Sequence, residues 1–209
     1  MLTKRSRNDR MSKKITAWLS IGSTYTYLTA LRIKDTQKQH NLVLQIKPIS
    51  IRQIMKALDN VPFPPSKKPK VDYMWRDIER RAEFYGLPKP KLPAPYPLQE
   101  FDRANHVGIL LNYQGKYLEY LEETYRVWFL EGLEAGSEGN LRKCLSKMSL
   151  NFDETVTRAN EEEVIAEYEA NTSEAQQLGI FGAPSFTIGK EIFWGDDRLE
   201  DAIRFSEGA

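Results

Sequence analysis

The chain has 209 residues, of which 41% are hydrophobic and 28% charged, enough for one well-buried domain with an inserted lobe. Its 30 basic and 29 acidic residues nearly cancel, so the overall charge does not indicate nucleic acid as a partner. No apolar stretch approaches the length of a transmembrane helix, and we expect no membrane partner.

Cysteine and histidine usage argues against disulfide and metal chemistry. The one cysteine, Cys144, lies in a helix-like run where a buried apolar role is expected, so no disulfide or CxxC pair can form within the chain. His40 and His106 have no ligand spacing to each other. We therefore predict no metal site.

Residues 1–14 are basic and lack an apolar core. This pattern excludes a secretory signal and favours a disordered tail, with a transit peptide or a nucleic-acid-binding arm as alternatives. Without a signal peptide or disulfides, the expected location is cytoplasmic, and the basic tail leaves an organellar address open.

The first folded segment reads as a β-α-β unit. Residues 15–21 have strand composition, Gly22-Ser23-Thr24 breaks the strand, and residues 25–33 place apolar side chains at helical spacing. Residues 41–50 alternate partly and read as a second strand. The crossover between the strands predicts that they are parallel.

The middle of the chain is helical. Proline-rich loops over residues 59–70 and 88–97 flank a helix predicted at 73–85. From residue 102 to about 178 the pattern is helical, with expected breaks near Gly115, 136–139 and 150–151. An apolar stripe that includes Tyr117, Tyr125, Trp128 and Phe129 is expected to be core.

The end of the chain returns to strands. Residues 185–188 and 191–194 form a predicted hairpin, and a last helix starts at Gly195 or Asp196. The order β-α-β, helices, β-β-α predicts an α/β, thioredoxin-like fold with a large all-helical insertion between its halves. We assign residues 15–58 and 180–209 to the thioredoxin-like domain and residues 59–179 to the inserted helical domain.

The bond between Ala183 and Pro184 stands where thioredoxin-like folds carry a cis proline facing the active site. A cis bond exposes the backbone of the preceding residue, so the N–H and C=O of Ala183 could pair with a peptide-like ligand. The alternative is an ordinary trans proline at a strand entry.

Ser23 is expected at a helix N-terminus, where free N–H groups favour an anion. A serine nucleophile would need a base, and none is visible. A more suitable role is to donate a hydrogen bond to the thiolate of a bound cofactor, because a thiol has a pKa of about 8.5 that such a site lowers. The alternative is a plain N-cap serine.

Three charged residues could meet a ligand. Asp196 and Asp197 either complement the dipole of the last helix or hold an ammonium group. Lys70 follows a proline-rich loop and either is solvated or meets a carboxylate.

Four segments together resemble the DsbA-like 2-hydroxychromene-2-carboxylate isomerases and their relatives, the kappa-class glutathione transferases. The segments are residues 23–28, 70–77, 179–186 and 193–199, in the same order as in the family, and the resemblance covers roughly residues 15–205. The last two segments are the most specific. The chain departs from the family at Thr24, where proline is common, and at residues 19–22, where Asp-Phe often precedes the serine.

The resemblance implies glutathione as a cofactor or substrate. It implies Ser23 beside the glutathione sulfur, and Ala183 and Pro184 at the cysteinyl portion. The outer contacts it implies are Asp196 and Asp197 at the γ-glutamyl end, Lys70 at the glycyl end, and Asn60 near the site.

The predicted function is a glutathione-dependent cis–trans isomerase of the 2-hydroxychromene-2-carboxylate type, acting on a small aromatic or α-keto acid substrate by thiol addition, bond rotation and elimination. One alternative is a kappa-class-like transferase that conjugates an electrophile, and another is a non-enzymatic DsbA-like binding module. The family implies a homodimer. Trp75, Phe63 and Tyr73 are candidates to line the second pocket.

Overall fold

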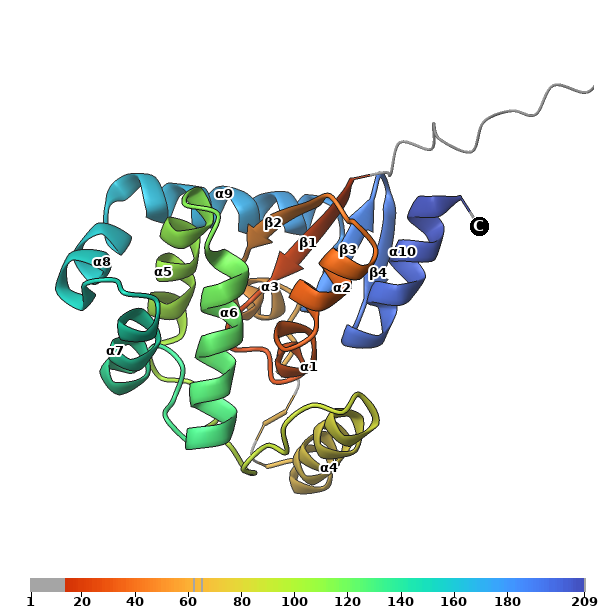
Figure 1. Cartoon of the computed structure of the whole chain (residues 1–209). Coiled ribbons are helices and arrows are strands. Elements are labelled where there is room, and N and C mark those ends of the chain that lie inside the picture. Colours follow the sequence, from red (N-terminus) through yellow and green to blue (C-terminus); the bar gives the residue numbers. More distant parts are fainter. Residues whose placement is uncertain (1–13, 62, 65, 209) are drawn as a thin grey trace, which may run out of the picture.

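A four-stranded mixed sheet forms the centre of the computed structural model, which describes residues 14–61, 63–64 and 66–208. Its strands are β1 (Ile15–Leu19), β2 (Leu44–Pro48), β3 (Ser185–Ile188) and β4 (Glu191–Trp194), in the order β2-β1-β3-β4 (Figure 1). β1 pairs parallel with β2 and antiparallel with β3, which forms the predicted hairpin with β4. The two ends of the chain therefore build one sheet, and the predicted thioredoxin-like fold is confirmed.

Short helices lie close to the sheet. They are α1 (Thr26–Ala30), α2 (Ile33–Gln39), α3 (Ile51–Ala57), the 3-10 turn η2 (Asp196–Arg198) and α10 (Leu199–Glu207). α10 packs against β1, β3 and β4 (Figure 1). The prediction of a single helix over residues 25–33 is wrong, because α1 ends at Ala30 and α2 begins at Ile33. Between them, the guanidinium of Arg32 binds the backbone oxygen of Asp196 and the carboxylate of Glu200.

The segment between the halves of the sheet is helical, as predicted. Its elements are α4 (Lys68–Phe84), α5 (Phe101–Tyr113), α6 (Tyr117–Arg126), the π-helical turn η1 (Val127–Glu131), α7 (Glu138–Lys147), α8 (Phe152–Ala159) and α9 (Glu162–Gln177). α4 begins five residues before the predicted start at Tyr73, because Pro69 fits the first turn of a helix. Lys70 therefore lies on α4 and does not belong to the preceding loop.

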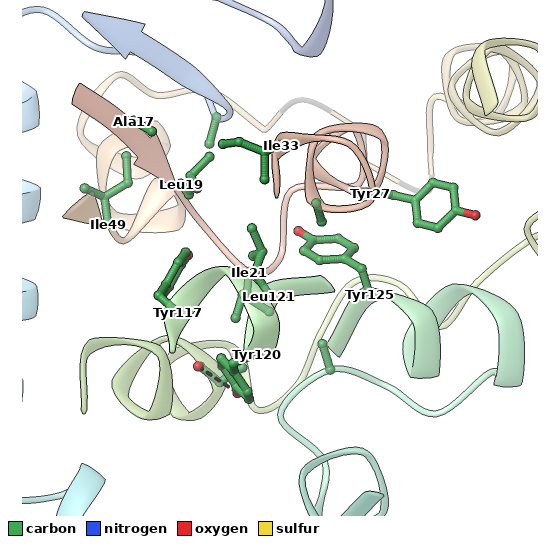
Figure 2. Packing of buried hydrophobic residues seen from close by; sticks show 14 of the residues in the cluster. Ala17, Leu19, Ile21, Tyr27, Ile33, Ile49, Tyr117, Tyr120, Leu121 and Tyr125 are labelled. Carbon is green, nitrogen blue, oxygen red and sulfur yellow. Dashed lines mark hydrogen bonds between the residues drawn. The ribbon is translucent and has the colours of Figure 1, made fainter. Parts of the chain in front are cut away.

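The apolar stripe of α6 and η1 is core, as predicted. Figure 2 shows Tyr117 and Leu121 of α6 below Leu19, the last residue of β1, and Tyr125 of α6 beside Ile21, which begins the following turn. All five side chains are buried, so one hydrophobic core joins the sheet to the helical segment. Cys144 is also buried, and burial raises the pKa of its thiol to about 12.

Some predictions fall outside what the structure tests. The basic segment 1–14 lies outside the described residues except for Lys14. The proposed domain boundaries, residues 15–58 with 180–209 and residues 59–179, stay a prediction. Among the helices of the described part of the chain, none is both long and apolar enough to span a membrane.

Candidate active site

The turn between β1 and α1 carries Ser23. α1 begins only at Thr26, its N-cap is Tyr25, and no side chain caps it. The interpretation of Ser23 as a plain N-cap is therefore wrong. The expected anion site at a helix N-terminus is also not supported, because Ser23 precedes the helix by three residues and α1 has five residues.

The Ser23 hydroxyl instead reaches the other half of the fold. It donates a hydrogen bond of 2.6 Å to the carbonyl oxygen of Ala183, and the Ala183–Pro184 bond is cis as predicted. Within the described part of the chain, no acceptor pairs with the N–H of Ala183. The structure thus brings a hydroxyl donor, a peptide oxygen and an unpaired peptide N–H together at one point.

Two buried side chains hold the backbone of this turn. The amide of Asn105 accepts the Ile21 N–H at 2.8 Å and donates to the Ile21 oxygen at 2.8 Å, as a neighbouring strand would. The Tyr125 hydroxyl lies 2.7 Å from the Ser23 carbonyl oxygen, to which it donates. Gly22 has φ +130°, and a Cβ there would lie 2.2 Å from the Phe101 ring, so the turn requires glycine.

α4 packs over the same turn. The Thr24 hydroxyl lies 3.0 Å from the sulfur of Met74, and the Tyr25 hydroxyl donates to Asp77 at 3.0 Å. Thr24, the position at which the family commonly has proline, therefore serves as a contact to α4.

The predicted acidic pair lies beside the cis proline. The Gly195 N–H donates to the Pro184 oxygen at 3.0 Å, which places η2 next to Ala183. Asp196 is buried, and its Oδ2 accepts a hydrogen bond of 2.8 Å from Arg81 Nη2. The side chain of Asp197 is 37% exposed and lies 3.7 Å from Arg81 Nη1. Arg198 Nη2 donates to Asp197 Oδ2 at 3.1 Å, so of the two carboxylates only that of Asp197 is partly open to solvent, and it is paired there.

Burial raises the pKa of Asp196 to about 6 from an ordinary value of 3.8. The loss of hydration outweighs the attraction of Arg81, and Asp197 adds repulsion. The charged and titratable groups around it come from four elements: Arg81 and Tyr85 at the end of α4, Arg32 before α2, Asp197 in η2, and Glu200 in α10, which pairs with Arg32.

The raised pKa of Asp196 predicts that the stability of the folded protein depends on pH. Because the folded state binds the Asp196 proton more tightly than the unfolded state, the stabilisation is present at low pH and is lost as the pH rises through about 6. Relative to Asp196→Asn, the protein should gain on the order of 2 kcal/mol of unfolding free energy between pH 7 and pH 4. Urea denaturation of both proteins across this range checks it, and parallel curves would contradict it.

The two remaining predicted site residues, Lys70 and Asn60, make no hydrogen bond to Ser23 or Ala183 among the described residues. Lys70 is exposed on the first turn of α4, and its Nζ lies 5.3 Å from the ring centre of Phe63, which in turn lies 6.4 Å from the ring of Tyr25. Asn60 is exposed, and its N–H donates to the Met55 oxygen. Among the described residues, no hydrogen bond joins Asn60 to Ser23.

Of the three aromatic candidates for a second pocket, Trp75 lines a groove. This groove runs along α4, has a volume of about 640 Å³, and also borders Val71, Leu92 and Pro93. Tyr73 is 59% exposed, and neither it nor Phe63 lines the groove.

Sequence reasoning missed the residues that support the site. Arg81 and Arg32 lie in charged, helix-like stretches that resemble solvated faces, and Asn105 and Tyr125 lie about 80 to 100 positions from Ser23. No local motif marks any of them, because each acts on a partner distant in the sequence.

The sheet, the cis proline and the serine turn define a thioredoxin-like protein with serine in the turn between β1 and α1. A family model described as a DSBA-like thioredoxin domain matches residues 14–203. The chain belongs to this DsbA-like thioredoxin-domain family.

Named relatives match nearly the whole chain. The 2-hydroxychromene-2-carboxylate isomerase of Sphingobium xenophagum is 27% identical over 91% of this chain and 96% of its own. Glutathione S-transferase kappa 2 of Caenorhabditis elegans is 25% identical over 92% of this chain and 91% of its own. A solved 2-hydroxychromene-2-carboxylate isomerase structure has a TM-score of 0.77 at 24% identity, covering 92% of this chain and 95% of that one. The resemblance seen in the sequence is confirmed.

Proposed function

We propose that this protein is a glutathione-dependent cis–trans isomerase of the 2-hydroxychromene-2-carboxylate type. The observation that carries the proposal is the contact of 2.6 Å between the Ser23 hydroxyl and the Ala183 oxygen, beside an Ala183 N–H that no described residue accepts. Similarity to isomerases of this name along nearly the full chain supports it.

The residues present fit glutathione. The unpaired N–H of Ala183 and its carbonyl oxygen match the backbone of the cysteinyl residue, which would pair there like an added strand next to Pro184. The partly exposed carboxylate of Asp197, which also accepts a hydrogen bond of 3.1 Å from Arg198 Nη2, suits the γ-glutamyl ammonium. The exposed Lys70 suits the glycyl carboxylate. Asn60 stays in the proposal as a nearby loop residue.

The Ser23 hydroxyl can donate one hydrogen bond, and in this structure it donates that bond to the Ala183 oxygen. When the backbone of the ligand pairs with Ala183, rotation of the Ser23 side chain would direct this hydrogen bond to the ligand's sulfur instead. A hydrogen bond to the thiolate lowers the thiol pKa from its usual value of about 8.5. Bound glutathione would supply a thiolate that adds to a conjugated double bond of an α-keto acid and later leaves it, with rotation in between.

The test is calorimetric titration with reduced glutathione, combined with ultraviolet titration of the bound thiolate. We expect the protein to bind glutathione and to lower the pKa of its thiol. Ser23→Ala should still bind but hold the thiol at a higher pKa, and should isomerise 2-hydroxychromene-2-carboxylate about 100-fold more slowly, the usual cost of losing a preorganised donor. Ser146→Ala, at an exposed position on α7, is the matched control and should behave like the parent protein.

Absence of binding at millimolar glutathione would overturn this function and leave the DsbA-like binding module. Similarity to a kappa-class transferase keeps conjugation as the second candidate. A product that retains glutathione would indicate conjugation. Recovery of glutathione unchanged after the reaction would indicate isomerisation. The homodimer, the cytoplasmic location and a small aromatic or α-keto acid as substrate stay predictions.

A further inference from the structure

Arg81 joins the last helical turn of α4 to η2. Its Nη2 lies 2.8 Å from Asp196 Oδ2 and 3.1 Å from the Tyr85 hydroxyl. The Asp196 side chain is 3% exposed, and a carboxylate that is buried to this extent is strongly disfavoured without a cation. Arg81 is the described cation that contacts this carboxylate directly, so it is the group that permits a charged residue at this position.

Arg32 reinforces the same junction from the other side. Its Nη2 donates to the backbone oxygen of Asp196 at 2.8 Å, and its guanidinium lies 3.8 Å from the centre of the Tyr85 ring. Tyr85 is the C-cap residue of α4. The end of α4 is thereby attached to η2 through both the side chain and the backbone of Asp196.

The two proposed charge contacts with the ligand lie on the two elements that this junction connects. Asp197 belongs to η2, whereas Lys70 lies in the first turn of α4. Lys70 precedes Arg81 by eleven positions, which is about 16 Å along a helix. α4 also contacts the serine turn between these two residues, through Met74 and Asp77. Release of its end at Arg81 would therefore let the helix tilt about those contacts and displace Lys70 relative to Asp197.

We propose that Arg81 is a positioning residue that neutralises the buried Asp196, attaches α4 to η2, and so holds Lys70 and Asp197 at the separation at which one ligand meets both. This inference rests on the proposed function. It assigns Asp196 a role in the attachment rather than at the ligand's ammonium group, which is left to Asp197.

The test compares glutathione with γ-glutamylcysteine, which lacks the glycine and carries its terminal carboxylate one residue earlier, on the cysteinyl residue. Because an exposed charge contact is worth a small factor, the protein should bind glutathione about fivefold more tightly than the dipeptide. In Arg81→Gln this ratio should fall to about one. The matched control is Arg80→Gln on the same helix, where Arg80 is exposed and pairs with Asp77, and it should keep the ratio. A ratio measured within one variant does not change with a general loss of folded protein.

A second variant covers a failure of Arg81→Gln to fold. Asp196→Asn removes the buried charge together with its attraction to Arg81, and it should also bring the ratio to about one. A fivefold ratio that persists in both variants would overturn the inference and leave the proposed function standing. Failure of the parent protein to bind either peptide at millimolar concentration would overturn both.

Discussion

With cysteine in place of Ser23, the protein should form a mixed disulfide when incubated with glutathione disulfide. The thiolate at position 23 would attack one sulfur of the disulfide, form a new sulfur–sulfur bond and release one glutathione thiolate. The proposed site places the ligand's sulfur within reach of residue 23, because the Ser23 hydroxyl already contacts Ala183. We therefore expect complete conversion, seen by intact-protein mass spectrometry.

The rest of the chain makes this experiment clean. The one native cysteine, Cys144, is buried with a thiol pKa raised to about 12, so the parent protein should form no adduct. Ser146→Cys places a thiol at an exposed position on α7, away from the turn, and serves as the matched control.

Kinetics distinguishes a binding site from mere exposure. Reaction of the Ser23→Cys protein should saturate with glutathione disulfide and run at least about tenfold faster than that of Ser146→Cys, because bound reactants gain effective concentration. A rate that rises linearly with the disulfide and equals the control rate would show that position 23 has no glutathione site.

Asn105→Leu should produce the largest loss of stability among substitutions near the turn. Asn105 is fully buried and makes three backbone hydrogen bonds, with the N–H and the oxygen of Ile21 and with the oxygen of Phe101. Leucine has a similar volume but leaves the N–H and the oxygen of Ile21 unpaired, at about 1–3 kcal/mol each, and loses the additional bond to the Phe101 oxygen. We expect the free energy of unfolding to fall by about 3–5 kcal/mol in urea denaturation.

Asn112→Leu provides the comparison for this loss. Asn112 is half-buried and donates one hydrogen bond, of 3.1 Å, to the Ile46 oxygen, so its replacement should cost about 1 kcal/mol. If Asn105→Leu cost no more than Asn112→Leu, the paired contact with Ile21 would not be what holds the turn.

Local pattern was sufficient for much of the fold. The hairpin of β3 and β4 occurs at its predicted residues, because a Gly-Lys turn between two short apolar runs specifies register locally. The helical breaks near Gly115 and before α7 and α8 also follow from local punctuation. Predictions failed where a distant partner competes with local preference, as at Arg32, whose contacts with Asp196 and Glu200 accompany the end of a helix that the spacing would have continued.

In the candidate site, too, some features follow from the local sequence and others only from tertiary contacts. The sequence by itself determined which chemical groups are available: the hydroxyl of Ser23, the peptide before Pro184, and the carboxylates of Asp196 and Asp197. The tertiary structure decided how they are used, because Arg81 binds the buried Asp196 while Asp197 stays partly open to solvent, and because Ser23 meets Ala183 from 160 positions away. Residue type and spacing encode short-range geometry, whereas burial and pairing of charges depend on which distant elements pack together.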